Sequence, residues 1–526
     1  MRSVTSTRTR WSCLLTLALF WSPALGAPPA SSPNVVLFCI DTLRADHVHC
    51  YGYPRPTSPT LDRLAADGTL FERAFAQAGW SLPSYSSLFT SRYSPSAKEL
   101  GQTGGGPSRV LAGIFRTFGY RTAAFVGGGH LSPGFGLNGG FDTYRSSLVL
   151  GSFSQTVPQA VDWLDHRPVG RFFLLVHGYD VHGPYRPPMV FSELYDPGYR
   201  GVVHAPGFLQ PKVLEGIRDN QYALSDLIGF EPETGIDWHE PERRRAVLPP
   251  FAPDLPPAPS SGIASPSVFA ARTSVPPAPV GTAQAQALPF ELPARRLPLS
   301  TADLEHLRAH YDGGVTYADA WLALFLEALS ARGLDRDTLV VVLGDHGEDL
   351  GEHGRFAHGS ALHDNLLHVP LIVRGPGVAA GRRVGQVVQL LDVAPTLLEL
   401  CGIPAFHDHQ GRSLARLAGG HDPLPGPSPA PAAFAFDESL SSLRTERWHL
   451  LRSDERKLGG PVVESLFDIG SDPHESKDVS TANPGAMTEL RGRLLDQLEE
   501  TILTSPRDAS RLSMEEKRFM SLMGYW

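Results

Sequence analysis

Three segments, far apart in the chain, carry side chains that together could activate a hydroxyl group. Asp41 ends an apolar run, Ser81 opens a serine-rich segment, and Asp345-His346 follows a second apolar run. Carboxylates and imidazoles bind divalent cations, and a hydroxyl beside such a cation loses its proton more readily. A serine activated in this way attacks phosphorus or sulfur, so the combination predicts a hydrolase of charged esters.

The two acidic segments predict a site for one divalent metal ion. A carboxylate at the end of a buried strand is costly unless it is paired or bound to a cation. Gly344 and Gly347 flank Asp345-His346 and let the backbone turn there. Mixed oxygen and imidazole ligands suit Zn or Mn somewhat better than Ca, although all three ions stay open. The simpler alternatives are an Asp41 that caps a turn and an Asp-His pair on the surface.

Ser81 is predicted to lie just ahead of a helix. Pro83 restricts the backbone, and residues 84–89 have the pattern of a first helical turn. The exposed amides and the dipole at such a helix N-terminus favour an anionic ligand. The simpler alternative is an ordinary serine cap.

The elements that would position these residues alternate along the chain. Strands are expected at the apolar runs 35–40, 122–126, 172–176 and 339–343, and helices at 57–68, 110–118, after Thr301 and at 393–400. This alternation predicts an α/β fold with a large, mainly parallel sheet and helices on both faces. Ligands of such folds bind where the strands end. Asp41, His177 and Asp345 each directly follow a predicted strand.

Bulk properties fit a large enzyme better than a nucleic-acid-binding protein. The chain has 526 residues, of which 42% are hydrophobic, so one large domain with a smaller partner is expected. The net charge of −9 offers no basic surface for nucleic acid. We therefore expect no nucleic-acid partner.

The first 27 residues have the pattern of a secretory signal peptide. Arginines at positions 2, 8 and 10 precede an apolar stretch at 13–20, and small residues follow at 24–27. The alternative is a membrane anchor, but the stretch is short for a membrane span, and no later segment is long enough. We expect a secreted or periplasmic chain with no membrane span in its mature form. Its cysteines, Cys39, Cys50 and Cys401, are odd in number and do not predict a disulfide framework.

Composition divides the rest of the chain. A large domain is predicted at 34–415, with a Pro/Ala-rich insertion at 231–298 that has too little apolar surface to fold alone. The proline-rich stretch 424–431 predicts a linker. Beyond it, a small α+β subdomain at 432–526 is expected, with strands at 433–437, 448–451 and 465–468 and a helix at 487–501.

The order of these motifs resembles the sulfatase family, a branch of the alkaline phosphatase superfamily. That family has an opening strand with a metal-binding Asp, a Cys/Ser-x-Pro-Ser-Arg nucleophile motif, a late Asp-containing metal pair, and a Val-Pro-Leu strand. The corresponding segments of this chain are 34–41, 81–91, 345–346, 368–377 and, more weakly, 466–475. The resemblance implies an alkaline phosphatase-like fold and one divalent metal.

The resemblance also implies roles for individual residues. Ser81 would be the nucleophile, His182 would contact the substrate anion, and His358 would bind the anion or protonate the leaving group. His130 and Tyr85 would help to bind substrate, while His177 and Asp180 are reserve candidates. The implied metal ligands are Asp41, Thr42, Asp345 and His346.

Three departures from the family motif bear on which ester is cut. Tyr85 replaces the motif's Arg, Ser91 replaces its Gly, and Thr42 replaces a second metal-binding Asp. Family members oxidise their nucleophile to formylglycine, and the Arg position is part of the motif that directs this oxidation. We expect hydrolysis of a small-molecule or glycan sulfate ester through Ser81, either unmodified or as formylglycine. Two alternatives stay open: a phosphodiesterase, phosphonate hydrolase or phosphotransferase using plain Ser81, and an inactive protein that binds an anionic glycan.

Overall fold

The computed structural model describes residues 32–93, 110–147, 150–200, 300–359, 361–404, 409–421, 433–437, 439–454, 456 and 460–503. The signal peptide at 1–27, the insertion at 231–298 and the linker at 424–431 lie outside these residues, so they stay predictions.

A nine-stranded sheet forms the centre of the larger part of the chain. Its strands are β1 (Asn34–Ile40), β2 (Thr69–Phe75), β3 (Arg121–Val126), β4 (Thr143–Ser146), β5 (Phe172–Gly178), β6 (Thr338–Gly344), β9 (His368–Val369), β10 (Leu371–Arg374) and β11 (Arg382–Gln389). They run in the order β11-β2-β10-β6-β1-β5-β3-β4, with β9 paired to β2. Strands β6, β1, β5, β3 and β4 are parallel, and β10 is antiparallel to its neighbours. The predicted α/β fold with a mainly parallel sheet is confirmed.

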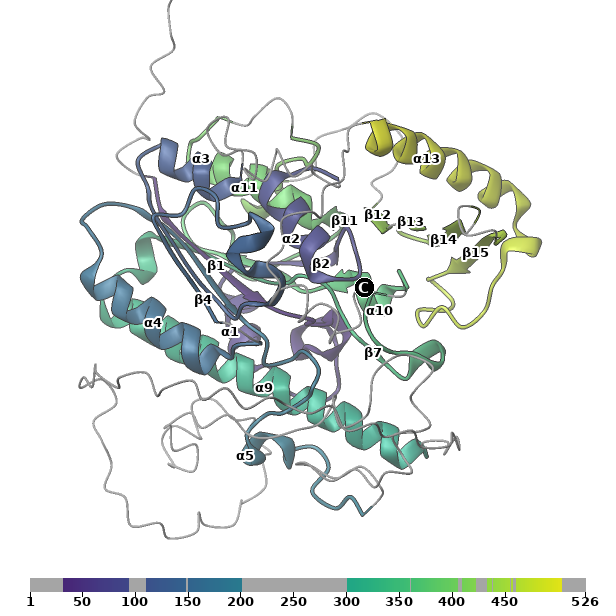
Figure 1. Cartoon of the computed structure of the whole chain (residues 1–526), viewed down its shortest axis with the longest axis horizontal. Coiled ribbons are helices and arrows are strands. Elements are labelled where there is room, and N and C mark those ends of the chain that lie inside the picture. The colour runs from purple at the N-terminus through teal and green to yellow at the C-terminus, as the bar shows by residue number, and fades with distance from the viewer. Residues whose placement is uncertain are drawn as a thin grey trace, which may run out of the picture.

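Helices cover both faces of this sheet (Figure 1). One face packs against α1 (Pro59–Ala66), α4 (Phe153–His166) and α9 (Thr301–Ala331), and the other against α2 (Ser81–Thr90), α3 (Leu111–Thr117) and α11 (Val393–Leu400). The central strand β1 is buried on both sides: Val36 and Phe38 face the first set, and Val35 and Leu37 face the second. Alternating contacts of this kind explain why the strand is apolar from Val35 to Ile40.

Shorter helices complete the layers and one end of the sheet. These are α5 (Met189–Ser192), α10 (Asp364–Leu367) and α12 (Ala415–Ala418). No helix among the described residues is long and apolar enough to span a bilayer.

Strand register brings the predicted chemistry to one edge. Ile40 at the end of β1 lies opposite Gly178 on β5 and Gly344 on β6. Because the three strands are parallel and end at the same level, Asp41 and Asp345 emerge side by side. His177, the last residue but one of β5, lies opposite Cys39.

The C-terminal part contains a second, antiparallel sheet. Its strands are β12 (Ala433–Asp437), β13 (Leu440–Arg444), β14 (Trp448–Asp454) and β15 (Val462–Asp468), in that order. Helix α13 (Pro484–Leu503) packs on it through Met487, Leu490 and Leu494. The strand predicted at 433–437 is present with the same bounds, the other two strands and the helix are longer than predicted, and β13 was missed. The exact division into 34–415 and 432–526 stays a prediction.

A buried charge cluster joins the two sheets. Arg444 Nε on β13 lies 3.0 Å from Asp364 Oδ2 on α10. The ring of His449 on β14 contacts Glu475 and lies 3.3 Å from Asp364. Burial alone would lower the pKa of His449, but Glu475 and Asp364 outweigh it and raise that pKa to about 9. His449 is therefore charged at neutral pH and pairs with both carboxylates.

The cluster predicts a pH-dependent stability. The folded-state pKa of His449 is raised above the value of about 6.5 for an unfolded chain. Its stabilising contribution is therefore complete below about pH 6.5 and is lost as pH rises through about 9. Between these pH values the melting temperature (Tm) should fall more steeply for the wild type than for His449→Gln. The exposed His421→Gln variant is the control and should follow the wild type, whereas parallel curves for wild type and His449→Gln would contradict the prediction.

Candidate active site

Two buried carboxylates meet at the ends of β1 and β6. Asp41 and Asp345 are both fully buried. Asp345 Oδ1 accepts the N–H groups of Thr42 (3.1 Å) and His346 (2.9 Å). Asp345 Oδ2 and Asp41 Oδ1 have no hydrogen-bond partner among the described residues. Burial raises the pKa of both carboxyl groups, and repulsion from Asp345 raises that of Asp41 further.

His346 completes a set of ligands that fits a divalent cation. Its Nδ1 lies 2.8 Å from the Gly347 carbonyl oxygen and donates to it, which leaves the lone pair on Nε2. Burial lowers the pKa of this imidazole well below its usual value, so the ring is neutral. One ligand atom each from Asp41, Asp345 and His346 lie within 4.8 Å of one another. A cation there would satisfy the unpartnered carboxylate oxygens and use the His346 lone pair.

His177 orients one of the carboxylates. Its Nδ1 accepts the Gly127 N–H (3.2 Å), so Nε2 carries the proton and donates to Asp41 Oδ2 at 3.1 Å. Burial lowers the pKa of His177 to about 3, which keeps the ring neutral. Of the two reserve candidates, His177 therefore supports the ligand set.

Asp180, the other reserve candidate, serves a helix. It accepts the N–H of Phe153 at 2.7 Å and the hydroxyl of Ser152, the residue before α4. Both contacts stabilise the start of that helix.

Ser81 lies beside the carboxylates and His346. It is the first residue of α2, not a residue ahead of the helix as expected. Its Oγ is 3.5 Å from Asp41 Oδ2 and 3.2 Å from His346 Nε2. Ser84 Oγ donates to the Asp345 carbonyl at 2.6 Å and fastens the helix to the end of β6. The N-terminus of α2 therefore points its positive end at the site.

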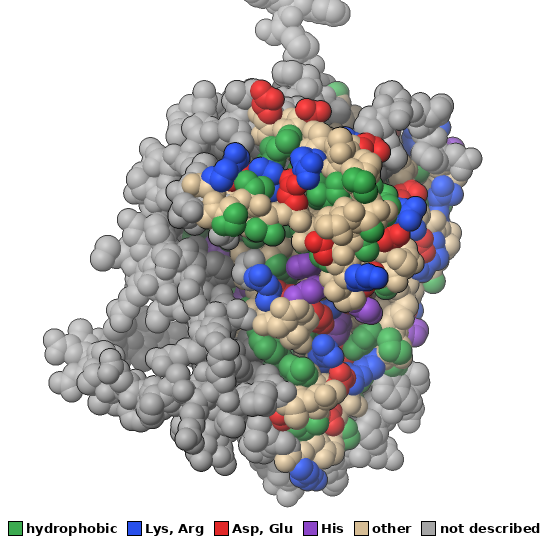
Figure 2. All heavy atoms as spheres, turned by 90° about the vertical axis from the view of Figure 1, so that its right-hand side faces the viewer, with side chains coloured by type: hydrophobic (Ala, Val, Ile, Leu, Met, Phe, Trp, Pro, Cys, Tyr) green, Lys and Arg blue, Asp and Glu red, His purple; other side chains and the backbone are tan. Residues whose placement is uncertain are grey.

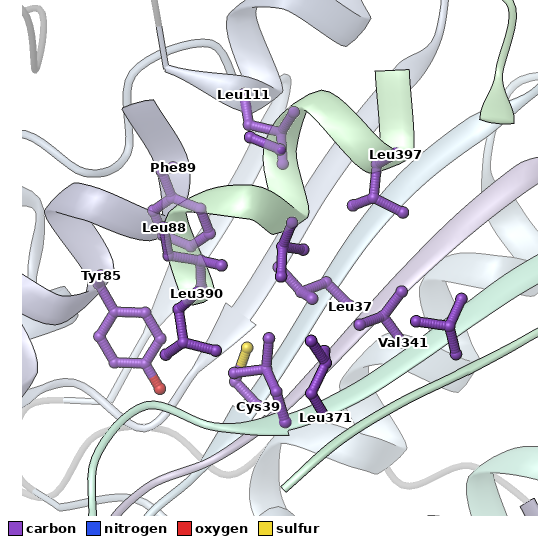
Figure 3. Close-up of a cluster of buried hydrophobic side chains, with 14 of the residues drawn as sticks. Leu37, Cys39, Tyr85, Leu88, Phe89, Leu111, Val341, Leu371, Leu390 and Leu397 are labelled. Carbon is purple, nitrogen blue, oxygen red and sulfur yellow. The ribbon is translucent and has the colours of Figure 1, made fainter. Parts of the chain in front are cut away.

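The ring of Tyr85 lies in the apolar core beside the site. It is fully buried and packs beside Leu88, Phe89 and Cys39 in the apolar cluster on one side of the sheet (Figure 3). It stacks on Phe89 and meets the edge of His177, with ring centroids 5.8 and 5.5 Å away. Its hydroxyl has no hydrogen-bond partner among the described residues, so its role in substrate binding stays a prediction.

Thr42 stands next to the ligand set in an unusual backbone conformation. Its φ is +54°, which is rare for a β-branched residue and is typical of strained functional positions. This conformation aims its N–H at Asp345 while its carbonyl accepts the Tyr311 hydroxyl at 2.6 Å. The buried Thr42 hydroxyl has no partner among the described residues, so its role as a ligand stays a prediction.

Three further histidines lie near His346. The ring of His358 lies 4.6 Å from that of His346 and 4.9 Å from that of His182, centroid to centroid. Burial, together with repulsion from neighbouring imidazoles, lowers the pKa of His130 to about 3 and that of His182 to about 4. These predicted histidines thus converge on one place. Figure 2 shows histidine side chains near the centre of one face of the molecule.

Two residues that were assigned no individual role from the sequence make contacts beside these histidines. Glu348 Oε1 lies 2.7 Å from His358 Nδ1, because the short hairpin of β7 (Asp349–Leu350) and β8 (Phe356–Ala357) brings the two residues together. Arg44 Nη1 donates to the Glu348 carbonyl at 2.9 Å and so ties the loop after β1 to that hairpin. The only sequence signal for Glu348 was its place three residues after Asp345.

Comparisons with known proteins agree with this geometry. The sulfatase family model matches residues 33–403, and the model for the C-terminal part of N-sulphoglucosamine sulphohydrolase matches residues 351–503. Arylsulfatase K of Gallus gallus is 30% identical over 229 residues, which cover 42% of this chain and 41% of that protein. The human arylsulfatase K is 30% identical over 214 residues, covering 39% of this chain and 38% of that protein. The chain thus spans about two fifths of the length of these relatives.

Solved structures share the fold at low sequence identity. The phosphonate monoester hydrolase of Agrobacterium radiobacter has a TM-score of 0.60 and 19% identity, covering 89% of this chain and 96% of its own. A protein solved with its substrate D-glucosamine-2-N,6-O-disulfate has a TM-score of 0.63 and 17% identity, covering 89% and 98%. Because the sulfatase model spans more than half of its residues, the chain belongs to the sulfatase family.

Proposed function

We propose that the chain is a metal-dependent hydrolase that cleaves a sulfate ester with Ser81 as the nucleophile. One observation carries the proposal: the Ser81 hydroxyl lies within 3.5 Å of Asp41 and within 3.2 Å of His346, two of three clustered metal-ligand candidates. A serine whose hydroxyl only capped a helix would not need to lie buried beside two such groups.

Asp41, Asp345 and His346 would hold one divalent ion, Ca, Mn or Zn, with Thr42 at its side. When bound, that ion supplies positive charge that lowers the pKa of a nearby hydroxyl and offsets the charge of an ester anion. Two features favour binding of this ion: burial keeps the ring of His346 neutral, and a hydrogen bond from His177 orients Asp41.

The chain's own groups account for the bond changes. Ser81 Oγ gives up its proton to water and forms a bond to sulfur while the bond from sulfur to the alcohol oxygen breaks. His358 gives a proton to that oxygen, and His182 and His130 lie beside it to contact the anion. Water then attacks sulfur and releases Ser81, or the aldehyde form eliminates sulfate where Ser81 is oxidised.

A second candidate is hydrolysis of a phosphate or phosphonate ester by unmodified Ser81. The observation that favours it is the burial of Tyr85 in apolar surroundings, at the place where the family motif has an arginine. Without that arginine, no guanidinium at this position binds the anion or directs oxidation of the nucleophile. The substrate in either case is a small-molecule or glycan ester, as for the relative solved with a disulfated glucosamine.

Export is part of the proposal and rests on the N-terminal pattern alone. A secreted or periplasmic location would follow from cleavage near residue 27. Edman sequencing of the chain recovered outside the cytoplasm tests it, and recovery of an uncleaved cytoplasmic chain would contradict it.

Metal binding should stabilise the wild type and not a ligand variant. At a metal concentration of 100 times Kd, the expected stabilisation is about 2.7 kcal/mol. In chelator, Asp345→Asn should be at least as stable as the wild type, because it removes one of two adjacent buried carboxylates. Thermal unfolding with chelator and with added Mn, Zn or Ca checks both expectations.

Asp319→Asn is the matched control for this experiment. Asp319 is also fully buried, but its oxygens accept the N–H groups of Thr60 (2.8 Å) and Leu61 (2.9 Å) at the start of α1. This variant should lose stability in chelator and still respond to metal. An equal metal response in Asp345→Asn and in the wild type would contradict the ligand assignment.

Ser81→Ala should lower kcat/KM for the cleaved ester by about 10³-fold or more, because it removes the nucleophile. Assays on aryl sulfate, aryl phosphate and aryl phosphonate esters with each metal measure this loss. Ser86→Ala is the control, since the Ser86 hydroxyl only donates to the Leu82 carbonyl within α2 (2.6 Å). It should keep near wild-type activity.

The same assays separate the candidate functions. Sulfate turnover together with loss of two hydrogens from the peptide containing Ser81 supports a formylglycine sulfatase. Phosphate or phosphonate turnover with an unmodified Ser81 supports the second candidate. Wild-type activity no higher than that of Ser81→Ala on every ester would contradict catalysis and favour an anionic-glycan-binding protein.

A further inference from the structure

Glu348 is a buried carboxylate that the proposed reaction leaves unused. It is fully buried beside the histidines and lies two residues after His346. Its Oε1 is 2.7 Å from His358 Nδ1, and its Oε2 accepts the Gly183 N–H at 3.4 Å. Both oxygens are therefore directed at groups of the protein, which distinguishes Glu348 from Asp41 and Asp345 with their unpartnered oxygens.

These two contacts connect His358 with the segment that carries His182. His358 follows β8, and Gly183 directly follows His182. A single carboxylate thus fixes the ring of one histidine and the backbone beside the other. The rings of His358 and His182 lie 4.9 Å apart.

The backbone around Glu348 is itself held in place. In the β7–β8 hairpin, Asp349 pairs with Ala357, so Glu348 and His358 come next to each other at its open end. Ala357 has a φ of +64°, a left-handed value that is rare for alanine and redirects the chain just before His358. The Arg44 guanidinium holds the Glu348 carbonyl at 2.9 Å.

From this geometry we infer that Glu348 is a positioning residue for His358, holding the ring so that proton transfer to a leaving group occurs through Nε2. An ionised carboxylate only accepts hydrogen bonds, so Nδ1 must carry a proton and donate it to Glu348. Proton exchange with substrate then falls to Nε2 on the other side of the ring. The inference rests on the proposed function, in which His358 protonates the leaving oxygen as the ester bond breaks.

Leaving-group dependence tests this role. A good leaving group such as 4-nitrophenolate needs little protonation, whereas phenolate needs much more. Glu348→Ala should lower kcat about 10²-fold or more for the phenyl ester and less than about tenfold for the 4-nitrophenyl ester. Glu348→Gln keeps an oxygen that can accept from Nδ1, so its losses should lie between those of Glu348→Ala and the wild type.

Glu352→Gln is the matched control. Glu352 lies in the same hairpin, but its carboxylate pairs with Arg44 at 3.2 Å and accepts the Leu350 N–H. Glu352→Gln should not change the ratio of kcat for the phenyl ester to kcat for the 4-nitrophenyl ester. Equal losses for both esters in Glu348→Ala, or no loss, would overturn the inference, since a purely structural role would affect both substrates alike.

A spectroscopic measurement makes the test independent of turnover. In protein with ¹⁵N-labelled histidine, His358 Nδ1 should be protonated in the wild type and in Glu352→Gln. It should lose this preference in Glu348→Ala, with His358→Gln identifying the signal. A wild type inactive on all esters would contradict the proposed function, whereas an unchanged His358 signal in Glu348→Ala would overturn the role of Glu348.

Discussion

The structure of this site depends on two carboxylates buried next to each other. Asp41 and Asp345 leave adjacent parallel strands at the same level, and each has an oxygen with no partner among the described residues. Such an arrangement is unfavourable unless a positive charge enters it. The neighbouring features serve that need: a neutral His346, the N–H groups of Thr42 and His346 on Asp345, and the N-terminus of α2. The nucleophile candidate Ser81 lies where this charge would act on it.

A second cluster of similar composition is neutralised by positively charged side chains of the protein itself. Asp364, His449 and Glu475 also bring potential metal ligands together. There, however, the positive charge comes from the protein, through Arg444 and a His449 whose pKa is raised to about 9. The composition of a cluster thus does not decide its role; the presence of an internal cation does. The first cluster lacks a comparable arginine or charged histidine among its described hydrogen-bond partners.

Much of the fold, and the closeness of Asp41 to Asp345, was predictable because both follow from local pattern. The run Val35–Ile40 is apolar throughout since both faces of β1 are covered, and Asp41 and Asp345 follow strands whose parallel arrangement places their ends together. The packing of Tyr85 against Phe89 could not be predicted, because a motif position does not reveal which side of a helix faces the core. The pairing of Glu348 with His358 was missed because it depends on strands of two residues each, too short for any periodicity. The His449 cluster joins residues up to 111 positions apart, with no motif to signal it.

The central claim is that a divalent ion binds between Asp41, Asp345 and His346. Anomalous diffraction from crystals of the protein grown with Mn tests it most directly. We expect an anomalous peak in contact with these three side chains and beside Ser81, and none at Asp364, His449 and Glu475. An empty first cluster at saturating Mn, or a peak at the second cluster alone, would contradict it.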